Sequence, residues 1–162
     1  MKLAVISDTH DNIKNLVKAL KGIKSAGCGT VIHCGDLASP FMIHELSEFK
    51  GEVHTVFGNV EGDQFTIKEF ADMYDNITLH GEAGFLKIDG GEIAFTHLPL
   101  FAKGLASTGN YKYVFYGHTH RHDRQKVNGC WLVNPGDLIG LHEKPGWLEV
   151  DTETAEFTRH GI

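Results

Sequence analysis

Short apolar runs that end in polar residues recur along the chain. Several are rich in β-branched and aromatic side chains, and one alternates polar and apolar positions, which are the patterns of buried and half-buried strands. Five such runs cover residues 3–6, 30–34, 52–57, 92–95 and 113–116. The pattern predicts a strand at each of them.

Between the first two predicted strands, apolar residues recur at helical spacing. Apolar positions recur from Ile13 to Ile23, Asp11 or Asn12 can cap the helix, and glycines at 27 and 29 can end it. A further helix is predicted to open at Ser39-Pro40, with Pro40 in its first turn, and to run through Leu46, and another is predicted at 65–74. Residues 99–107 fit either a short helix or a flexible lip. The alternation of strands and helices predicts an α/β fold.

Antiparallel pairs are predicted in the second half of the chain. Asp89-Gly90-Gly91 and Asn128-Gly129 are hairpin turn signals, and each separates two strand-like runs. The paired segments are 85–88 with 92–95, 123–127 with 130–133, and 147–150 with 155–158.

Length and composition limit the class of protein. The 162 residues, of which 41% are hydrophobic, fit one soluble domain over 1–162, and no apolar run is long enough to span a bilayer. The apolar run at 3–6 is too short for a signal-peptide core, so we expect a cytoplasmic protein with three reduced cysteines. The net charge of -6 argues against binding to a nucleic-acid backbone.

Metal-ligating residue types follow the five strands. Their imidazole, carboxylate and amide groups stand at or just beyond the strand ends, namely Asp8, His10, Asp36, Asn59, His97, His118 and His120. Binding sites of open α/β sheets form outside the carboxyl ends of the strands, so these residues are expected to converge. Taken alone, the pair His118 and His120 also fits a hydrophobic strand that runs into a polar turn. Seven such ligands without a thiolate suit two borderline divalent ions that share a carboxylate, an arrangement that attacks phosphate esters.

The set closely resembles the motifs of the calcineurin-like metallophosphoesterases. The resemblance rests on Asp8-x-His10, Gly35-Asp36, Gly58-Asn59, His97 and Gly117-His118-Thr119-His120, and it covers nearly the whole chain. The length and the turn at 134–136 look most like the small single-domain bacterial and archaeal phosphodiesterases, which share their fold with the retromer subunit Vps29. The resemblance implies a two-sheet αββα sandwich.

The resemblance also implies roles for the site residues. One metal would bind Asp8, His10, Asp36 and His120, and the other Asp36, Asn59, His97 and His118, with Asp36 bridging. Asp36, Asn59 and His97 are the expected catalytic residues. Asn12 and Thr119 are candidates for substrate contacts, although a helix cap explains Asn12 equally well.

Three places depart from the family pattern. Val60 stands where many members have a histidine that protonates the leaving group, so activated or phenolic diesters should be the better substrates. Glu61, the acidic residue that follows as in the family pattern, is expected to be an exposed loop carboxylate, and whether it replaces the missing histidine stays open. Leu98 follows His97 where glycine is common, and Asp137 stands where serine is frequent, which affects substrate shape rather than metal binding.

The sequence thus predicts a binuclear-metal-dependent phosphodiesterase that uses in-line attack of a metal-bridging hydroxide. Manganese is the favoured metal, with iron, zinc, nickel and magnesium as alternatives, and the expected partner is a small phosphoester. We expect no nucleic-acid or membrane partner and leave a homo-oligomer open. Two other functions stay open: a Vps29-like interaction scaffold with a residual metal site, and a phosphomonoesterase.

Overall fold

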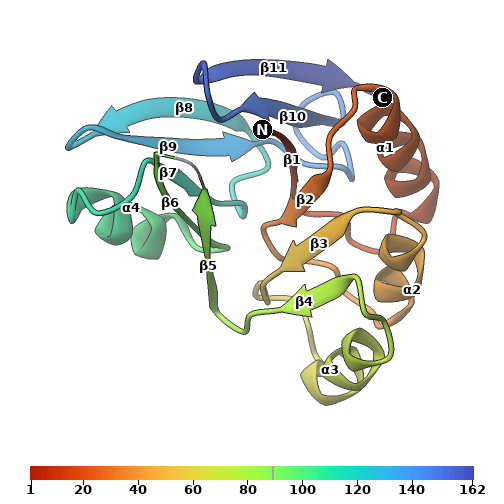
Figure 1. The fold of residues 1–162 in the computed structure, drawn as a ribbon. Helices are drawn as coiled ribbons and strands as arrows, with labels where there is room; N and C mark the ends of the chain where they lie inside the picture. The colour runs from red at the N-terminus through yellow and green to blue at the C-terminus, as the bar shows by residue number, and fades with distance from the viewer. Residues whose placement is uncertain (89) are drawn as a thin grey trace.

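Two β-sheets lie face to face in the computed structural model, which describes residues 1–88 and 90–162 (Figure 1). The first sheet has six strands in the order β11-β10-β1-β2-β3-β4. These strands are β1 (Lys2–Ile6), β2 (Thr30–His33), β3 (Glu52–Thr55), β4 (Ile77–Leu79), β10 (Gly146–Asp151) and β11 (Glu156–Gly161). Strands β1 to β4 run parallel, and β10 pairs antiparallel with β1.

The second sheet has five strands in the order β5-β6-β7-β9-β8. They are β5 (Ala83–Ile88), β6 (Gly91–Thr96), β7 (Tyr113–Phe115), β8 (His122–Val127) and β9 (Cys130–Pro135). Strands β6, β7 and β9 run parallel, whereas β5 and β8 form antiparallel hairpins at the two edges.

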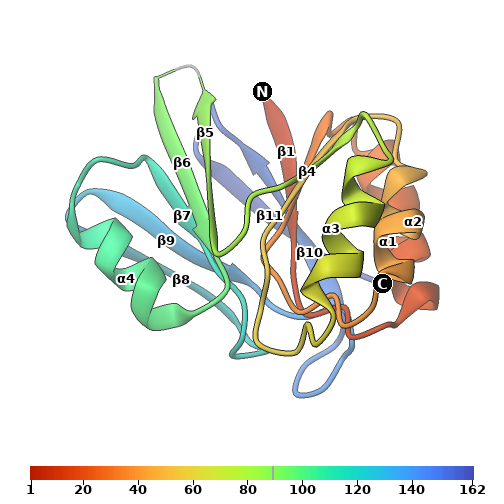
Figure 2. The ribbon, with the colours of Figure 1, turned by 90° about the horizontal axis from the view of Figure 1, so that it is seen from below.

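Helices cover the outer face of each sheet. The four helices of the described residues are α1 (Ile13–Ser25), α2 (Phe41–Ser47), α3 (Gln64–Asp72) and α4 (Pro99–Ser107). The first three pack on the first sheet and α4 packs on the second, so that Figure 2 shows four layers in the order helix, sheet, sheet, helix. The predicted αββα sandwich is confirmed.

Three apolar layers hold the sandwich together, and alternate residues of one strand enter different layers. In β1, Leu3 and Val5 face the second sheet, whereas Ala4 and Ile6 pack against the helices. The layer between the sheets is rich in aromatic side chains, including Phe95, Tyr113 and Phe115. The period of two in strand side chains therefore explains why continuous apolar runs mark strands buried on both faces.

Most predicted elements are confirmed. Residues 99–107 form a helix, which excludes the flexible lip, and Asn12 caps α1 by accepting a hydrogen bond from the Asn15 backbone N–H at 3.1 Å. The predicted pairing of 85–88 with 92–95 is present, while Asp89 of its turn lies outside the described residues. Strand β4 was not predicted, because it has three residues and only Ile77 is buried, too few for a periodic signal.

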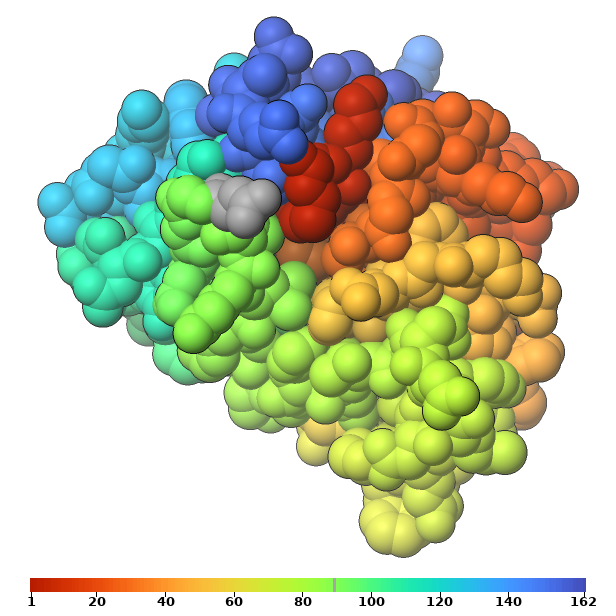
Figure 3. All heavy atoms as spheres, viewed as in Figure 1, coloured from red at the N-terminus to blue at the C-terminus, as the bar shows by residue number. Residues whose placement is uncertain are grey.

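The carboxyl ends of the parallel strands lie at one edge of both sheets, at the bottom of Figure 2. The amino terminus lies away from this edge, at the surface between the C-terminal hairpin and the α1 side (Figure 3). Among the described residues, no helix has both the length and the apolar character needed to cross a membrane.

Candidate metal centre

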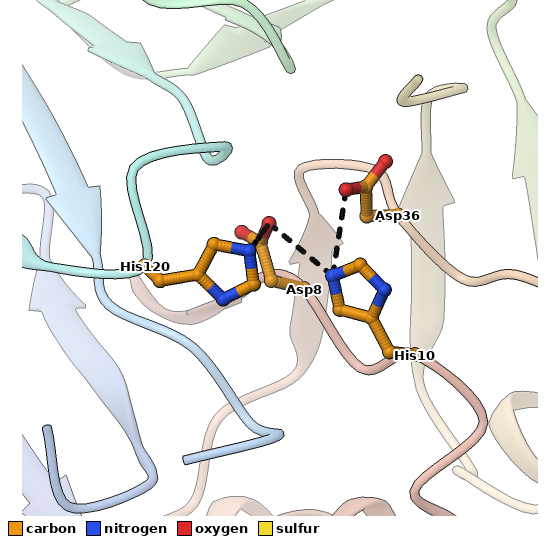
Figure 4. A group of neighbouring side chains, drawn as sticks. All are labelled: Asp8, His10, Asp36 and His120. Atoms are coloured by element: carbon orange, nitrogen blue, oxygen red, sulfur yellow. Dashed lines mark ion pairs between the residues drawn. The ribbon is translucent and has the colours of Figure 1, made fainter. Parts of the chain in front are cut away.

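Four predicted ligands form a first group beyond the ends of β1, β2 and β7 (Figure 4). The ligand atoms of Asp8, His10, Asp36 and His120 all lie within 4.8 Å of one another. His10 Nε2 lies 3.4 Å from Asp36 Oδ2, and His120 Nε2 lies 3.3 Å from Asp8 Oδ1. Two carboxylates and two imidazoles thus converge as expected for one ion.

A second group lies on the other side of Asp36. Asp36 Oδ1 is 3.3 Å from His97 Nε2, which is 2.9 Å from Asn59 Oδ1. Asn59 Oδ1 is also 2.6 Å from His118 Nδ1. The two carboxylate oxygens of Asp36 therefore face different groups, so Asp36 is the residue that joins them. All seven predicted ligands belong to one or the other group.

The donor atoms fit a bound cation. Among the described residues, His10 Nε2 is a buried side-chain polar atom without a hydrogen-bond partner, although it lies close to two carboxylates. A buried polar group without a partner is costly, and a metal ion would satisfy this nitrogen. Oxygen and imidazole donors without a thiolate are the set preferred by borderline divalent ions.

Backbone strain is concentrated in the same loops. Five of the seven candidate ligands have positive φ angles between 53° and 71° or, for His10, 43°. They are Asp8, His10, Asp36, His118 and His120. A non-glycine residue in this region costs of order 1 kcal/mol or more, and such residues cluster at functional sites. The strained backbone therefore lowers the stability of the fold but orients these side chains toward the site.

Neighbouring groups set the ionisation of Asp36. Burial raises the pKa of the carboxyl, but the hydrogen bond and charge of His97 and the Asn59 backbone N–H outweigh it and hold the pKa at about 2. Conversely, the nearby carboxylates of Asp8 and Asp36 raise the pKa of His10 above its usual value, although burial lowers it. Burial lowers the pKa of His97, yet Asp36 more than offsets this and raises it. Asp36 is thus an anion at neutral pH, as a ligand must be.

Glycines precede several candidate ligands because a carboxylate from a neighbouring loop lies too close to the backbone there for a side chain. A Cβ atom at Gly58 would lie 2.0 Å from Asp36 Oδ1, and one at Gly117 would lie 2.7 Å from Asp8 Oδ2. No side chain fits at such distances. The glycine that precedes a ligand type in the sequence therefore has a steric cause.

His33 supports the site as a neutral residue. Its ring is buried, Nδ1 accepts a hydrogen bond from the Gly35 backbone N–H, and Nε2 lies 3.1 Å from the Thr9 hydroxyl. Burial lowers the pKa of His33 to about 4. His33 thus packs inside the sandwich at the end of β2, and its contacts hold two ligand-bearing loops together.

Asp137 is a site residue whose role was not predicted. It is buried, and its Oδ2 accepts a hydrogen bond from His120 Nδ1 at 2.8 Å and from the Leu141 backbone N–H at 2.9 Å. Its Oδ1 accepts from the Gly140 backbone N–H. A carboxylate on the far nitrogen of a ligand histidine fixes the tautomer and the ring orientation. Asp137 therefore leaves His120 Nε2 free for metal.

Replacement of Asp137 by asparagine is expected to weaken metal binding by about 10–100-fold, because the amide cannot accept all three of these hydrogen bonds. Titration calorimetry of the metal-free variant with Mn²⁺ measures the effect. Asp151→Asn is the control, since that carboxylate also accepts a backbone hydrogen bond, from Glu153, but lies outside the site. Equal affinity in both variants would contradict the role of Asp137.

The expectation for Glu61 is wrong. Its side chain is buried, with Oε1 2.5 Å from the Leu37 backbone nitrogen and Oε2 2.8 Å from the Gly58 nitrogen. A buried carboxylate is retained when backbone donors satisfy it. Glu61 thus ties the loop after β2 to the loop after β3, on either side of the Asp36 and Asn59 ligands.

The two candidates for substrate contacts already have partners in the protein. Asn12 is the cap of α1, and the Thr119 hydroxyl accepts a hydrogen bond from Asn134 Nδ2 at 3.1 Å, although Thr119 is exposed beside the ligands. His142 places its exposed ring edge-on to the candidate ligand His120, with the ring centroids 6.0 Å apart. Local sequence carries no signal for that contact.

Comparisons with known proteins show the family of this chain. Residues 1–155 match the family model of the calcineurin-like phosphoesterase superfamily domain. The chain is 31% identical to the phosphodiesterase MJ0936 of Methanocaldococcus jannaschii, over 97% of this chain and 96% of the relative.

Solved structures show the same fold. One of an archaeal phosphodiesterase superposes with a TM-score of 0.92 at 30% identity, over the full length of both chains. The phosphoesterase YfcE of E. coli, with a TM-score of 0.71 at 16% identity, also matches over both full lengths. Vps29 of Entamoeba histolytica in complex with zinc has a TM-score of 0.64 at 20% identity, over 98% of this chain and 90% of that one, and shows the fold alone. The chain belongs to the calcineurin-like phosphoesterase superfamily.

Proposed function

We propose that this chain is a binuclear-metal-dependent phosphodiesterase that hydrolyses a small phosphodiester by in-line attack of a hydroxide on phosphorus. The relative from Methanocaldococcus jannaschii, which matches over nearly its whole length, is named a phosphodiesterase. The converging carboxylates and imidazoles support a metal-dependent form of this chemistry.

The observation that carries the proposal is the position of Asp36 between two groups of donors. Oδ2 faces His10 at 3.4 Å, and Oδ1 faces His97 at 3.3 Å. A carboxylate whose oxygens point to separate groups is suited to bridge two cations, and paired cations about 3.5–4 Å apart are used for in-line displacement at phosphorus.

The residues present divide into two ligand sets. Asp8, His10, Asp36 and His120 would hold one ion, and Asp36, Asn59, His97 and His118 the other. When bound, the ions would supply a nucleophilic water near neutral pH and neutralise charge on the phosphate. Manganese is our first choice because the donors are oxygen and imidazole, with iron, zinc, nickel and magnesium as alternatives.

Residues of the chain hold these donors in position. The Asn59 and Val60 backbone N–H groups donate to Asp36 Oδ1 at 2.7 and 3.2 Å, and His97 Nδ1 donates to the Cys34 carbonyl at 2.9 Å. His97 Nε2 therefore points to the site in a fixed tautomer. We assign Asp36, Asn59 and His97 the catalytic roles, because Asp36 joins the two groups and Asn59 and His97 lie next to it, where they can orient the phosphate.

Metal dependence tests the proposal. Protein stripped with a chelator is expected to hydrolyse bis(4-nitrophenyl) phosphate at least about 100-fold more slowly than the same protein restored with Mn²⁺, because Asp8 and Asp36 alone repel the anion. The release of nitrophenol measures the rate, and parallel samples with iron, zinc, nickel or magnesium rank the metals. Full activity in the stripped protein, or none with any metal, would contradict the proposal.

The same assay addresses the alternatives. Faster hydrolysis of 4-nitrophenyl phosphate than of the diester would favour a phosphomonoesterase. No turnover on either substrate, together with a stoichiometric protein partner, would favour a scaffold; the likeness to Vps29 supports no more than the shared fold. Three expectations stay predictions: the single-domain organisation, the cytoplasmic location, and the partners, which are a small phosphoester and an open homo-oligomer.

A further inference from the structure

Two histidines outside the candidate metal centre face each other at the edge of the first sheet. His54 lies in β3 and His80 follows β4, and His54 Nδ1 is 3.1 Å from His80 Nε2. Thr78 of β4 is paired with His54, and the His80 backbone N–H donates to the Thr55 carbonyl at 2.9 Å. His80, two positions after Thr78, therefore projects to the same side of the sheet as His54. We call these two residues the histidine pair.

The histidine pair lies where the two sheets meet. Ile32 is the residue of β2 paired with His54, and it packs in the layer between the sheets, so His54 points to that layer. The ring of His80 lies edge-on to Phe95 of the second sheet, with the centroids 5.1 Å apart. His80 also stands in the connection from β4 to β5, which carries the chain from one sheet to the other (Figure 1). Both side chains are half-buried, so they are held in place and still reachable from solvent.

The separation of the two ring nitrogens fits coordination of one ion. Two imidazole nitrogens that each bind a zinc ion at about 2.0–2.1 Å lie roughly 2.9–3.4 Å apart, for angles at the metal between a right angle and the tetrahedral angle. His54 Nδ1 and His80 Nε2 have this separation already. An ion could therefore bind without a large movement of either strand.

Glu52 lies at the far nitrogen of one member of the pair. Its Oε2 is 3.7 Å from His54 Nε2, the nitrogen that is not directed at His80. A carboxylate in this position keeps the proton on the far nitrogen and leaves the near one free for metal. Asp137 has the same relation to the candidate ligand His120.

Both rings of the histidine pair are in the protonation state that a metal ligand needs. Burial lowers the pKa of His54, although Glu52 opposes this effect. Burial and the neighbouring His54 lower the pKa of His80. The two rings are thus neutral at pH 7, and an ion does not have to displace a charged proton form.

We propose that the histidine pair binds one divalent ion of the zinc, nickel and copper class, at a site that shares no residue with the candidate metal centre. In the free protein, His80 Nε2–H donates to His54 Nδ1, because Glu52 favours the proton of His54 on Nε2. On binding, the His80 proton moves to Nδ1 of the same ring, and the two facing nitrogens bind the ion. Water completes the coordination. The ion would fasten β3 to the connection that leads into the second sheet.

Metal counts with two different ions test the site. Imidazole ligands bind zinc far better than manganese, the weakest binder of the divalent series. In equilibrium dialysis at equal free metal concentrations, the wild type should therefore bind about one more Zn²⁺ than Mn²⁺ per chain. The doubly substituted His54→Gln, His80→Gln variant should lose this difference. His44→Gln is the control, since it changes an exposed histidine that contacts Tyr74 outside the pair, and it should keep the wild-type difference.

Nuclear magnetic resonance of the histidine ring nitrogens locates the ion in the wild type, so this measurement does not depend on the folding of any variant. The signals of His54 Nδ1 and His80 Nε2 should shift when Zn²⁺ is added, and that of His44 should not. Equal counts of Zn²⁺ and Mn²⁺ in the wild type, an unchanged difference in the double variant, or ring signals of the pair that stay in place would each overturn the proposal. The pair would then be a hydrogen bond between neutral rings and nothing more.

Discussion

Replacement of Asp36 by asparagine is expected to lower kcat/KM for a phosphodiester by about 1000-fold, which corresponds to about 4 kcal/mol of transition-state stabilisation. Asp36 is the residue whose two oxygens face both donor groups, at 3.4 Å from His10 and 3.3 Å from His97. An amide keeps one oxygen and turns an N–H₂ group toward the other group. The variant should therefore lose charge at both metal positions at once.

Metal content distinguishes the loss of a bridging metal ligand from the loss of the attacking hydroxide alone. The wild type should bind two ions per chain, and Asp36→Asn at most one, as measured by elemental analysis of protein dialysed against Mn²⁺. Asp72→Asn, which changes an exposed carboxylate of α3 paired with Lys68, should match the wild type in both assays. An Asp36→Asn protein that retains two tightly bound ions would refute the bridging role.

The convergence of the seven candidate ligands could be predicted because its signals are local. An apolar strand, a glycine and then a carboxylate or imidazole occur within a few residues, and Gly58 is required because a side chain there would collide with Asp36. The parallel direction of β1, β2 and β3 then brings the strand ends together, as general sheet geometry predicts. The αββα layers follow from the same strands, whose apolar residues enter two different layers.

The residues that support the ligands could not be predicted in the same way. Asp137 contacts His120 across 17 positions of sequence, and Glu61 reaches Leu37 across 24. Such contacts depend on how loops meet in space, and a charged residue in a loop is by default exposed. The unusual aspartate in the turn at 134–137 was the one available signal, and it was interpreted as a feature of substrate shape. In the structure its carboxylate orients a ligand.

Replacement of Gly58 by alanine is expected to reduce activity at least about 100-fold and to lower the free energy of unfolding by about 1–3 kcal/mol. The new Cβ would lie 2.0 Å from Asp36 Oδ1 and 2.4 Å from the Asp36 nitrogen. The carboxylate would have to turn away and lose its hydrogen bonds from the Asn59 and Val60 N–H groups. A single methyl group should thus disturb both metal positions without removing any ligand.

Gly62→Ala is the matched control for this change. Gly62 lies in the same connection between β3 and α3, and a Cβ there would meet no atom within 4 Å. Its activity, metal content and denaturant unfolding curve should all resemble those of the wild type, within about 0.5 kcal/mol in stability. Because both variants add the same methyl group to one loop, a difference between them isolates the collision with Asp36. Equal behaviour would show that the carboxylate tolerates displacement and that the close approach of Gly58 does not organise the centre.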